Sequence, residues 1–302
     1  MTASDDRSEF ARRASEIIEE YPEWYHSIEL APGVVTPGRV SLDALNRTLQ
    51  ALELPDLRGK SVLDIGAYDG FFSFAAEKLG AARVVALDEH VWATDMTAYM
   101  REWREARASG TAMPAPRDSR HWRPSELPGR KPFDAAHRLL NSKVEPMVGN
   151  FMTMALAALG RFDVVFFFGI LYHLEDPLAA IRRVGGLLNP GGFLGIETEA
   201  IEAPGAPDAP FFEFFPTNEL HNDAANWWAP NARAIEALTK AIGLCDFKLC
   251  KGPPPLTPIR RLRATIARER FRYRAVAHAY APFETRASFD TSRSRGAAQD
   301  DT

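Results

Sequence analysis

The 302-residue sequence lacks features that define several classes of protein. Its only cysteines, Cys245 and Cys250, are too close together for a disulfide framework and have no second pair for a metal site. No apolar run approaches the length of a bilayer span, and the acidic start MTASDDRSEFARR is unlike a secretory signal. A net charge of −4 gives no general attraction to nucleic acid or membranes. We therefore expect a soluble, cytoplasmic protein with reduced thiols, no metal centre and no membrane partner.

From residue 60 onward, short apolar segments alternate with helical patterns. The predicted strands are SVLDI (61–65), ARVVALD (82–88), VEPMV (144–148), FDVVFFF (162–168), GFLGIET (192–198) and DFKLC (246–250). Unbroken apolar strands separated by helices are typical of a parallel sheet that helices cover on both faces. The pattern predicts a doubly wound α/β domain.

Three regions depart from this alternation. Residues 1–58 are predicted to form N-terminal helices near 4–21 and after Ser41, joined by an aromatic loop at 22–39 that serves as a lid. Because the first strand begins at residue 61, we expect the sheet to fold without residues 1–30. The sheet domain, 59–284, carries insertions at 91–143 and 199–230, and 285–302 is predicted to be a disordered tail.

The run Gly66-Ala67-Tyr68-Asp69-Gly70 after the first strand predicts a ligand-binding turn. A dinucleotide turn reads G-x-G-x-x-G, whereas this sequence has Tyr68 where the middle glycine should be, and no P-loop lysine follows. Asp64 ends the first strand and Asp88 ends the second, so carboxylates surround the turn. Carboxylates suit the ammonium and ribose groups of S-adenosylmethionine better than a phosphate. The alternative is that both residues only cap loops.

Further motifs follow in order: GNF (149–151), FFFGILYHL (166–174) and NPGG (189–192). Together with VLDIGAYDGFFSF and VVALDE, they resemble the core of class I S-adenosylmethionine-dependent methyltransferases. More narrowly, the chain is similar to the branch of tRNA wobble-uridine (5-methoxyuridine or carboxymethyl) transferases. The resemblance implies a seven-stranded, mostly parallel Rossmann-like sheet with S-adenosylmethionine as cofactor. It also implies these cofactor-binding residues: Asp64, Gly66, Ala67, Tyr68, Gly70, Asp88, Glu89, Asn150, Phe151, Phe168 and Gly169.

Catalytic candidates follow the fourth strand, where the donor methyl group should point. A base accelerates transfer to a hydroxyl by about 10²–10⁴-fold; His173 would accept the proton and Tyr172 would orient the acceptor. The alternative for His173 is a local hydrogen bond that only shapes its loop. His26 and His221 are further candidates on loops that would close over the cofactor. Aromatic rings predicted to wall the acceptor pocket are Trp24, Tyr25, Phe215, Trp227 and Trp228.

Three functions remain open at this stage: methylation of a small molecule, with oxygen as the expected acceptor atom; modification of a wobble uridine in tRNA; or cofactor binding without catalysis. The arginine-rich segment 260–274 and the loop residues Arg120, His121 and Arg123 would contact tRNA phosphates under the second. The ordinary interpretation of such a segment is an exposed face. The acidic chain and the absence of a separate RNA-binding domain favour the small molecule, and the sequence does not indicate the oligomeric state.

Overall fold

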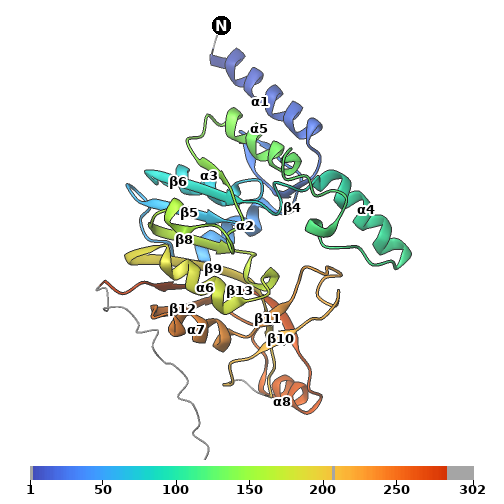
Figure 1. Ribbon diagram of the computed structural model, residues 1–302, viewed down its shortest axis with the longest axis vertical. Helices are drawn as coiled ribbons and strands as arrows, with labels where there is room; N and C mark the ends of the chain where they lie inside the picture. Colours follow the sequence, from blue (N-terminus) through green and yellow to red (C-terminus); the bar gives the residue numbers. More distant parts are fainter. Residues whose placement is uncertain (1–2, 206–207, 284–302) are drawn as a thin grey trace, which may run out of the picture.

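The computed structural model describes residues 3–205 and 208–283; the predicted disordered tail, 285–302, lies outside the described residues. Its centre is a seven-stranded sheet with the strand order β12-β13-β9-β8-β5-β6-β7 (Figure 1). The strands are β5 (Ser61–Ile65), β6 (Arg83–Asp88), β7 (Glu145–Val148), β8 (Phe162–Phe168), β9 (Leu188–Glu202), β12 (Cys245–Lys251) and β13 (Phe271–Tyr280). Five neighbouring strands pair in parallel: β9, β8, β5, β6 and β7. The predicted doubly wound, mostly parallel α/β sheet is therefore confirmed.

One edge of the sheet is antiparallel, because β13 pairs with both β9 and β12 in that sense. The pairing of β13 with β9 runs without interruption from Phe271 opposite Glu202 to Tyr280 opposite Phe193. The strand predictions above omit β13, whose inner half is built from alanines, residues of low β-propensity. The strand is recognisable only by its alternating arginines, and these are not simply a solvated face, as described below.

Helices cover both faces of the sheet. α3 (Phe71–Lys78) and α5 (Lys131–Leu139) cover one face, and α6 (Pro177–Gly186) and α7 (Ala232–Ala241) cover the other. Two more helices, α4 (Met96–Ser109) and α8 (Pro258–Ile266), project away from the sheet (Figure 1). The short 3₁₀ turns are η1 (Pro116–Asp118), η2 (Pro128–Arg130), η3 (Leu156–Ala158) and η4 (Leu171–His173). Asp176 caps α6, its carboxylate accepting the Ala179 N–H at 2.8 Å. No helix among the described residues is both long and apolar enough to cross a membrane.

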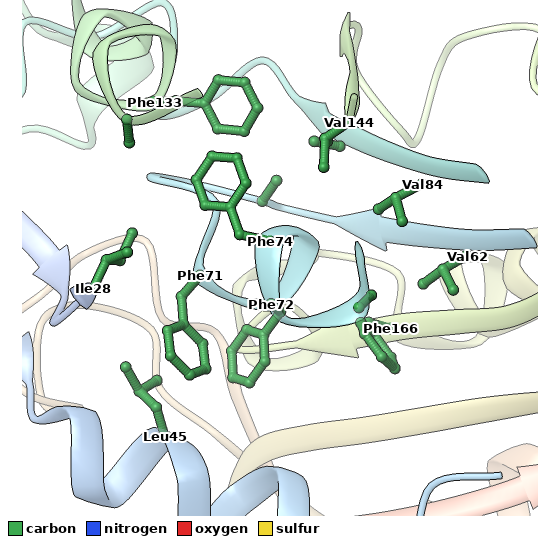
Figure 2. Packing of buried hydrophobic residues seen from close by; sticks show 14 of the residues in the cluster. Ile28, Leu45, Val62, Phe71, Phe72, Phe74, Val84, Phe133, Val144 and Phe166 are labelled. Atoms are coloured by element: carbon green, nitrogen blue, oxygen red, sulfur yellow. The ribbon is translucent and has the colours of Figure 1, made fainter. Parts of the chain in front are cut away.

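Successive side chains of each strand enter two separate hydrophobic cores, as the alternation of a strand requires. On one face Val62 packs with the rings of α3 and with Phe133 of α5; Phe74 and Phe133 stack at 5.3 Å (Figure 2). On the other face Leu63 packs with α6 and α7. Because the two cores bury alternate side chains of β5, they fix its register between β6 and β8.

The leader is part of the first of these cores. It holds α1 (Ala3–Glu20), α2 (Leu42–Ala51) and four short strands where the sequence predicted a loop: β1 (Trp24–His26), β2 (Glu29–Ala31), β3 (Val34–Val35) and β4 (Gly38–Val40). Trp24, Ile28 and Leu30 are fully buried in the same cluster as Val62. Removing residues 1–30 would take these buried side chains from one face of the sheet, so their burial argues against the expectation that the sheet folds without them. Trp24 packs in the core, and its predicted contact with an acceptor stays a prediction.

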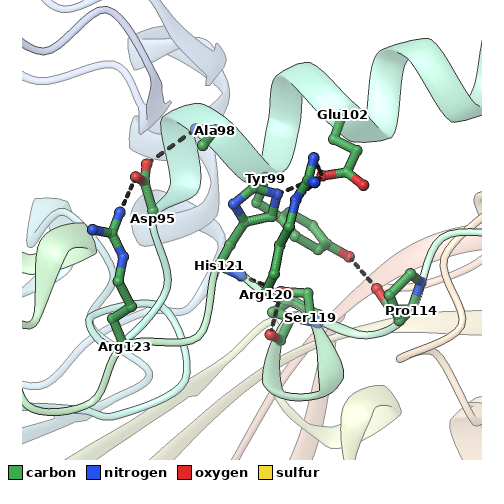
Figure 3. Close-up of polar contacts among 10 residues, drawn as sticks. Asp95, Ala98, Tyr99, Glu102, Pro114, Ser119, Arg120, His121 and Arg123 are labelled. Atoms are coloured by element: carbon green, nitrogen blue, oxygen red, sulfur yellow. Dashed lines mark hydrogen bonds and ion pairs between the residues drawn. The ribbon is translucent and has the colours of Figure 1, made fainter.

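Ion pairs within the insertion 91–143 engage the loop residues that were predicted to contact tRNA phosphates, namely Arg120, His121 and Arg123 (Figure 3). Glu102 of α4 accepts hydrogen bonds from Arg120 at 2.8 Å and contacts His121 Nε2 at 2.6 Å. Arg123 pairs with Asp95, the residue that caps α4. These charges hold the loop against α4 and are already neutralised, so they do not form a free basic surface.

Candidate active site

The glycine turn (residues 66–70) joins β5 to α3 at the carboxyl edge of the sheet. The Gly66 N–H donates to the Leu87 carbonyl at 2.8 Å, which ties the turn to β6. Gly70 begins α3 with a left-handed φ of 93°, and a Cβ there would lie 2.7 Å from ring atoms of Phe74 and Phe133. Only glycine fits at this position, because both the conformation and the space exclude a side chain.

Tyr68 replaces the middle glycine of the turn and also adopts a left-handed conformation, with φ of 55°. Its N–H donates to Asp88 Oδ2 at 3.0 Å, and its carbonyl accepts from Trp92 Nε1 at 2.6 Å. Its ring stacks on Tyr25 of β1, with 4.9 Å between centroids. A non-glycine residue in this region is strained, and these three contacts hold it there.

Asp64 and Asp88 lie at neighbouring strand ends and are both buried. Asp64 accepts a hydrogen bond from the Ser73 hydroxyl at 2.6 Å, and Asp88 Oδ1 accepts the Val91 N–H at 2.9 Å. Burial raises the pKa of each carboxyl to about 6. Each carboxylate has more lone pairs than these bonds use, so both can still accept from an ammonium or a ribose hydroxyl. Glu89, which follows Asp88, is partly exposed.

Asp69 is a buried turn residue to which the sequence assigned no role. Its Oδ2 accepts the backbone N–H groups of Tyr25 at 2.8 Å and His26 at 2.9 Å, and its Oδ1 contacts His26 Nδ1. Asp69 therefore clamps the leader to the glycine turn. His26, a catalytic candidate, is engaged in this clamp, and no contact among the described residues joins it to His173 or His221.

Gly169 follows the end of β8, the strand that pairs with β5 beside the glycine turn. Gly169 has φ of 70°, and its N–H donates to the Glu197 carbonyl at 2.8 Å. The nearest atoms to a Cβ built at Gly169 are Arg274 Nη2 at 3.7 Å and the Tyr172 hydroxyl at 3.9 Å. Phe168, just before it, packs into the core against α3. A side chain at position 169 would therefore contact Arg274 and Tyr172, so Gly169 is bordered by the two polar groups that we expect near the donor methyl group.

The residues predicted near the adenine, Asn150 and Phe151, follow β7. Asn150 Oδ1 accepts the Met152 N–H at 2.9 Å and so stabilises its own turn. Phe151 is buried, with its ring 5.9 Å from Phe167 and beneath the Arg183 guanidinium. Their contact with an adenine stays a prediction.

Tyr172 and His173 lie in η4, which follows Gly169 at the end of β8. His173 Nδ1 lies 2.9 Å from the carbonyl of Ala225, in the second insertion. Since a carbonyl only accepts hydrogen bonds, Nδ1 carries the proton and Nε2 has the free lone pair. Burial lowers the pKa of His173 below its ordinary value. Burial raises the pKa of Tyr172, so that side chain is a hydrogen-bond donor at neutral pH.

A charged cluster lies beside Tyr172 and comprises Glu197 and Glu199 of β9, Arg274 of β13 and His221 of the second insertion. Arg274 forms a bidentate pair with Glu197, and its guanidinium carbon is 5.1 Å from the centre of the Tyr172 ring. Glu199 Oε2 is 3.6 Å from Arg274 Nη1 and 3.1 Å from His221 Nε2. The fold therefore brings His173 and His221 together around one arginine.

Other arginines of the segment 260–274 are also paired within the chain. Arg270 pairs with Glu213, Arg260 pairs with Glu269, and Arg272 lies over Phe215 and donates to the Glu219 carbonyl at 3.3 Å. These contacts attach the second insertion to the sheet. Their contribution is structural, and it removes most of the free cations that a phosphate-binding surface would need.

The predicted aromatic wall divides into two groups. Phe215 is buried in a small cluster with Ile201, Leu220 and Ala229, and its contact with an acceptor stays a prediction. Tyr25, Trp227 and Trp228 are partly exposed and remain candidates. The Trp227 N–H donates to the Tyr172 carbonyl at 2.8 Å, which places the second insertion directly against η4.

Sequence reasoning missed Glu197, Glu199 and Arg274 as a group. The signal was present in GIETEA, where two glutamates alternate at the carboxyl end of a strand and so share one face. The described residues include no group of three or more His, Cys, Asp or Glu side chains that could hold a metal ion.

Comparisons with known proteins agree on one family. A family model described as a methyltransferase domain matches residues 39–243. The tRNA U34 carboxymethyltransferases of Desulfotalea psychrophila and Idiomarina loihiensis are each 25% identical to the chain, over 68% and 66% of its length. The chain spans about half the length of these curated relatives (53% and 50%).

Solved structures show the same fold at low identity. The N-terminal domain of EvdMO1, determined with SAH and D-fucose, is 17% identical, with a TM-score of 0.51 over 91% of this chain and 97% of that one. Phosphoethanolamine N-methyltransferase 2 of Haemonchus contortus, in complex with S-adenosyl-L-methionine, is 14% identical, with a TM-score of 0.51 over 81% of this chain and 55% of that one.

Proposed function

The chain belongs to the family of methyltransferase domains, and we propose that it transfers the methyl group of S-adenosylmethionine to a hydroxyl oxygen of a small molecule. When bound, S-adenosylmethionine supplies a methyl group on a sulfonium; its carbon–sulfur bond breaks as the carbon–oxygen bond forms, and neutral S-adenosylhomocysteine (SAH) leaves. Both structural neighbours described above were solved with this cofactor or its product. The glycine turn and the carboxylates Asp64 and Asp88 fit its ammonium and ribose groups.

The observation that carries the proposal is the contact between His173 Nδ1 and the Ala225 carbonyl. The Nδ1 atom donates to this carbonyl, which leaves Nε2 as the proton acceptor, and the lowered pKa of His173 keeps the ring neutral at pH 7. Nε2 has no hydrogen-bond partner among the described residues. As the acceptor oxygen attacks, its proton passes to Nε2. Tyr172 stays protonated and orients the oxygen by donating a hydrogen bond.

The alternative acceptor is a wobble uridine in tRNA, which the curated relatives favour. An RNA acceptor needs cations that are free to contact phosphates. Most arginines next to the site are paired with carboxylates or bound to loop carbonyls of the chain itself. This pairing supports a small molecule over RNA. Cofactor binding without catalysis does not explain a neutral histidine with a free Nε2 beside the methyl-delivering end.

The test is transfer of radiolabel from methyl-labelled S-adenosylmethionine into an extract of the source organism. We expect label in the low-mass fraction and none in the ribonuclease-sensitive fraction. His173→Ala should lower the rate of transfer by about 10²–10⁴-fold while SAH affinity stays unchanged. His173→Gln should be equally slow, because an amide donates and accepts hydrogen bonds but does not take up the proton.

Label in RNA, or no label in any fraction, would refute the proposed function. A fully active His173→Gln variant would leave methyl transfer intact and make His173 a positioning residue instead of the base. The matched control is His137→Gln. His137 lies in α5, on the far side of the glycine turn, and its Nε2 also contacts a backbone carbonyl, that of Val144, at 2.9 Å.

A further inference from the structure

Helix α8 carries its large apolar side chains on its exposed side. Ile259, Leu262 and Ile266 are 67%, 61% and 74% exposed, whereas Ala264 is fully buried. At about 100° per residue, the three side chains lie within about 60° of one another and on the side opposite Ala264. A surface helix normally buries such a stripe against the core. The described part of the chain therefore leaves this aliphatic stripe (Ile259, Leu262 and Ile266) uncovered.

The charges around the aliphatic stripe are all positive. Residues 258–268 include four arginines and no acidic residue. Arg260 and Arg261 reach carboxylates of the chain itself. Arg263 lies next to the stripe on the helix surface and Arg268 follows the helix, and neither forms an ion pair with a described residue. Two free cations therefore accompany an exposed apolar surface.

The size and shape of the stripe argue against a protein partner. The stripe is a ridge of three side chains on a projecting helix (Figure 1), whereas a stable protein interface takes roughly 20–30 residues from each side. The residues that dominate such interfaces are Trp, Tyr and Arg, and α8 has no aromatic residue. A second copy of α8 against the first would bring only arginines together, which repel each other.

The surface of an anionic bilayer suits both the stripe and the cations. An amphipathic helix lies in the plane of that surface with its aliphatic side chains among the head groups and upper acyl chains. Arginines beside the stripe extend their charged ends toward the acidic head groups. RNA would engage the arginines through its phosphates but would leave the aliphatic side chains in water.

We propose that α8 binds the surface of an anionic lipid bilayer, with the aliphatic stripe inserted and Arg263 and Arg268 against the lipid head groups. The net charge of −4 gives the chain as a whole no attraction to such a surface, so the contact is confined to this helix. This binding is peripheral and goes beyond the proposed methyl transfer.

Sedimentation of the full chain with extruded vesicles tests the inference. We expect binding to vesicles of phosphatidylcholine mixed with phosphatidylserine, at least tenfold weaker binding to phosphatidylcholine alone, and a loss of this difference at high salt. The double variant Leu262→Gln/Ile266→Gln keeps the charge and a good helix former at both positions, and it should bind the mixed vesicles at least tenfold more weakly. Arg263→Gln should weaken this binding about fivefold.

Two matched controls change the same residue types elsewhere on the surface. Leu79→Gln replaces a leucine that is 50% exposed at the end of α3, and Arg182→Gln replaces an exposed arginine of α6. Both should bind the mixed vesicles as the wild type does. Because every substituted side chain is exposed, circular dichroism and SAH affinity should match the wild type in all the variants.

Absence of wild-type binding to the mixed vesicles overturns the inference, and so does equal binding by Leu262→Gln/Ile266→Gln. Equal binding to both kinds of vesicle contradicts the requirement for anionic lipid and overturns it as well. A dimer in analytical ultracentrifugation that the double variant does not form would show that a second copy covers the stripe instead. Binding of bulk tRNA in place of vesicles would assign the arginines to RNA. None of these vesicle results depends on methyl transfer, so the proposed function is tested separately by the labelling experiment.

Discussion

Replacing Asp69 tests whether the leader and the glycine turn form one structural unit. Asp69 is 2% exposed, and it satisfies two backbone N–H groups of the leader, those of Tyr25 and His26, as well as the His26 ring. In Asp69→Ala both N–H groups lose their acceptor inside the protein, at a cost of about 1–3 kcal/mol each. The total expected loss in the free energy of unfolding is about 3–5 kcal/mol. A loss of this size lowers the melting temperature by about 5–8 °C in a protein of this length.

Urea unfolding measures the loss, and hydrogen exchange of the Tyr25 and His26 amides locates it. The matched control is Asp163, which accepts the Ser61 N–H, the Ser61 hydroxyl and the Asn189 amide, each at 2.8 Å, at the other end of the strands. Asp163 is partly exposed, so Asp163→Ala should cost about 1–2 kcal/mol and leave leader exchange unchanged. The reasoning is refuted if Asp69→Ala unfolds within 1 kcal/mol of wild type with both leader amides still protected.

Two further predictions concern the carboxylates at the strand ends. Asp88→Ala removes an acceptor from the expected ribose site and should weaken SAH binding by roughly 1.5–3 kcal/mol, or about 10–150-fold; an unchanged calorimetric affinity would dismiss this role. Burial raises the native pKa of Asp64 and Asp88 to about 6, so between about pH 4 and pH 6 the native state holds protons that the unfolded chain has already released. The free energy of unfolding should therefore fall as pH rises from about 4 to about 6. Urea titrations should show a smaller fall in Asp88→Asn, and an equal fall would show that other groups cause it.

The central sheet was predictable because its strands are short, apolar and bounded by glycine or a helix cap. The strand β13 was not, since Ala275, Ala277 and Ala279 have low β-propensity and are buried only because β9 and β12 lie on either side. The leader strands were missed for a related reason. β1 forms its ladder with β4, and its conformation depends on Asp69, which is distant in sequence. The local sequence around β1 does not indicate that it pairs with β4 or that Asp69 binds its amides.

The cofactor side of the site was more predictable than the acceptor side. Gly66, Gly70 and Asp88 occupy one local motif and the next strand end, and the structure brings them together. The acceptor side is assembled from β9, β13, η4 and the second insertion, so no single stretch encodes it. Phe215 illustrates the limit, because its buried neighbours Ile201 and Ala229 and the Arg272 guanidinium above its ring come from other parts of the chain.

Tyr68 is the main departure from the expected glycine motif, and the leader provides its physical explanation. A tyrosine with φ of 55° persists only where the surroundings hold it. Its amide is fixed by Asp88, its carbonyl by Trp92 and its ring by Tyr25, whose own amide is held by Asp69 of the same turn. The ring that replaces the missing glycine therefore adds a second contact between the turn and the leader, beside the hydrogen bonds of Asp69. The turn is glycine-poor because its conformation is stabilised from outside the motif, by the residues that also place Tyr25 near the Arg274–Glu197 pair.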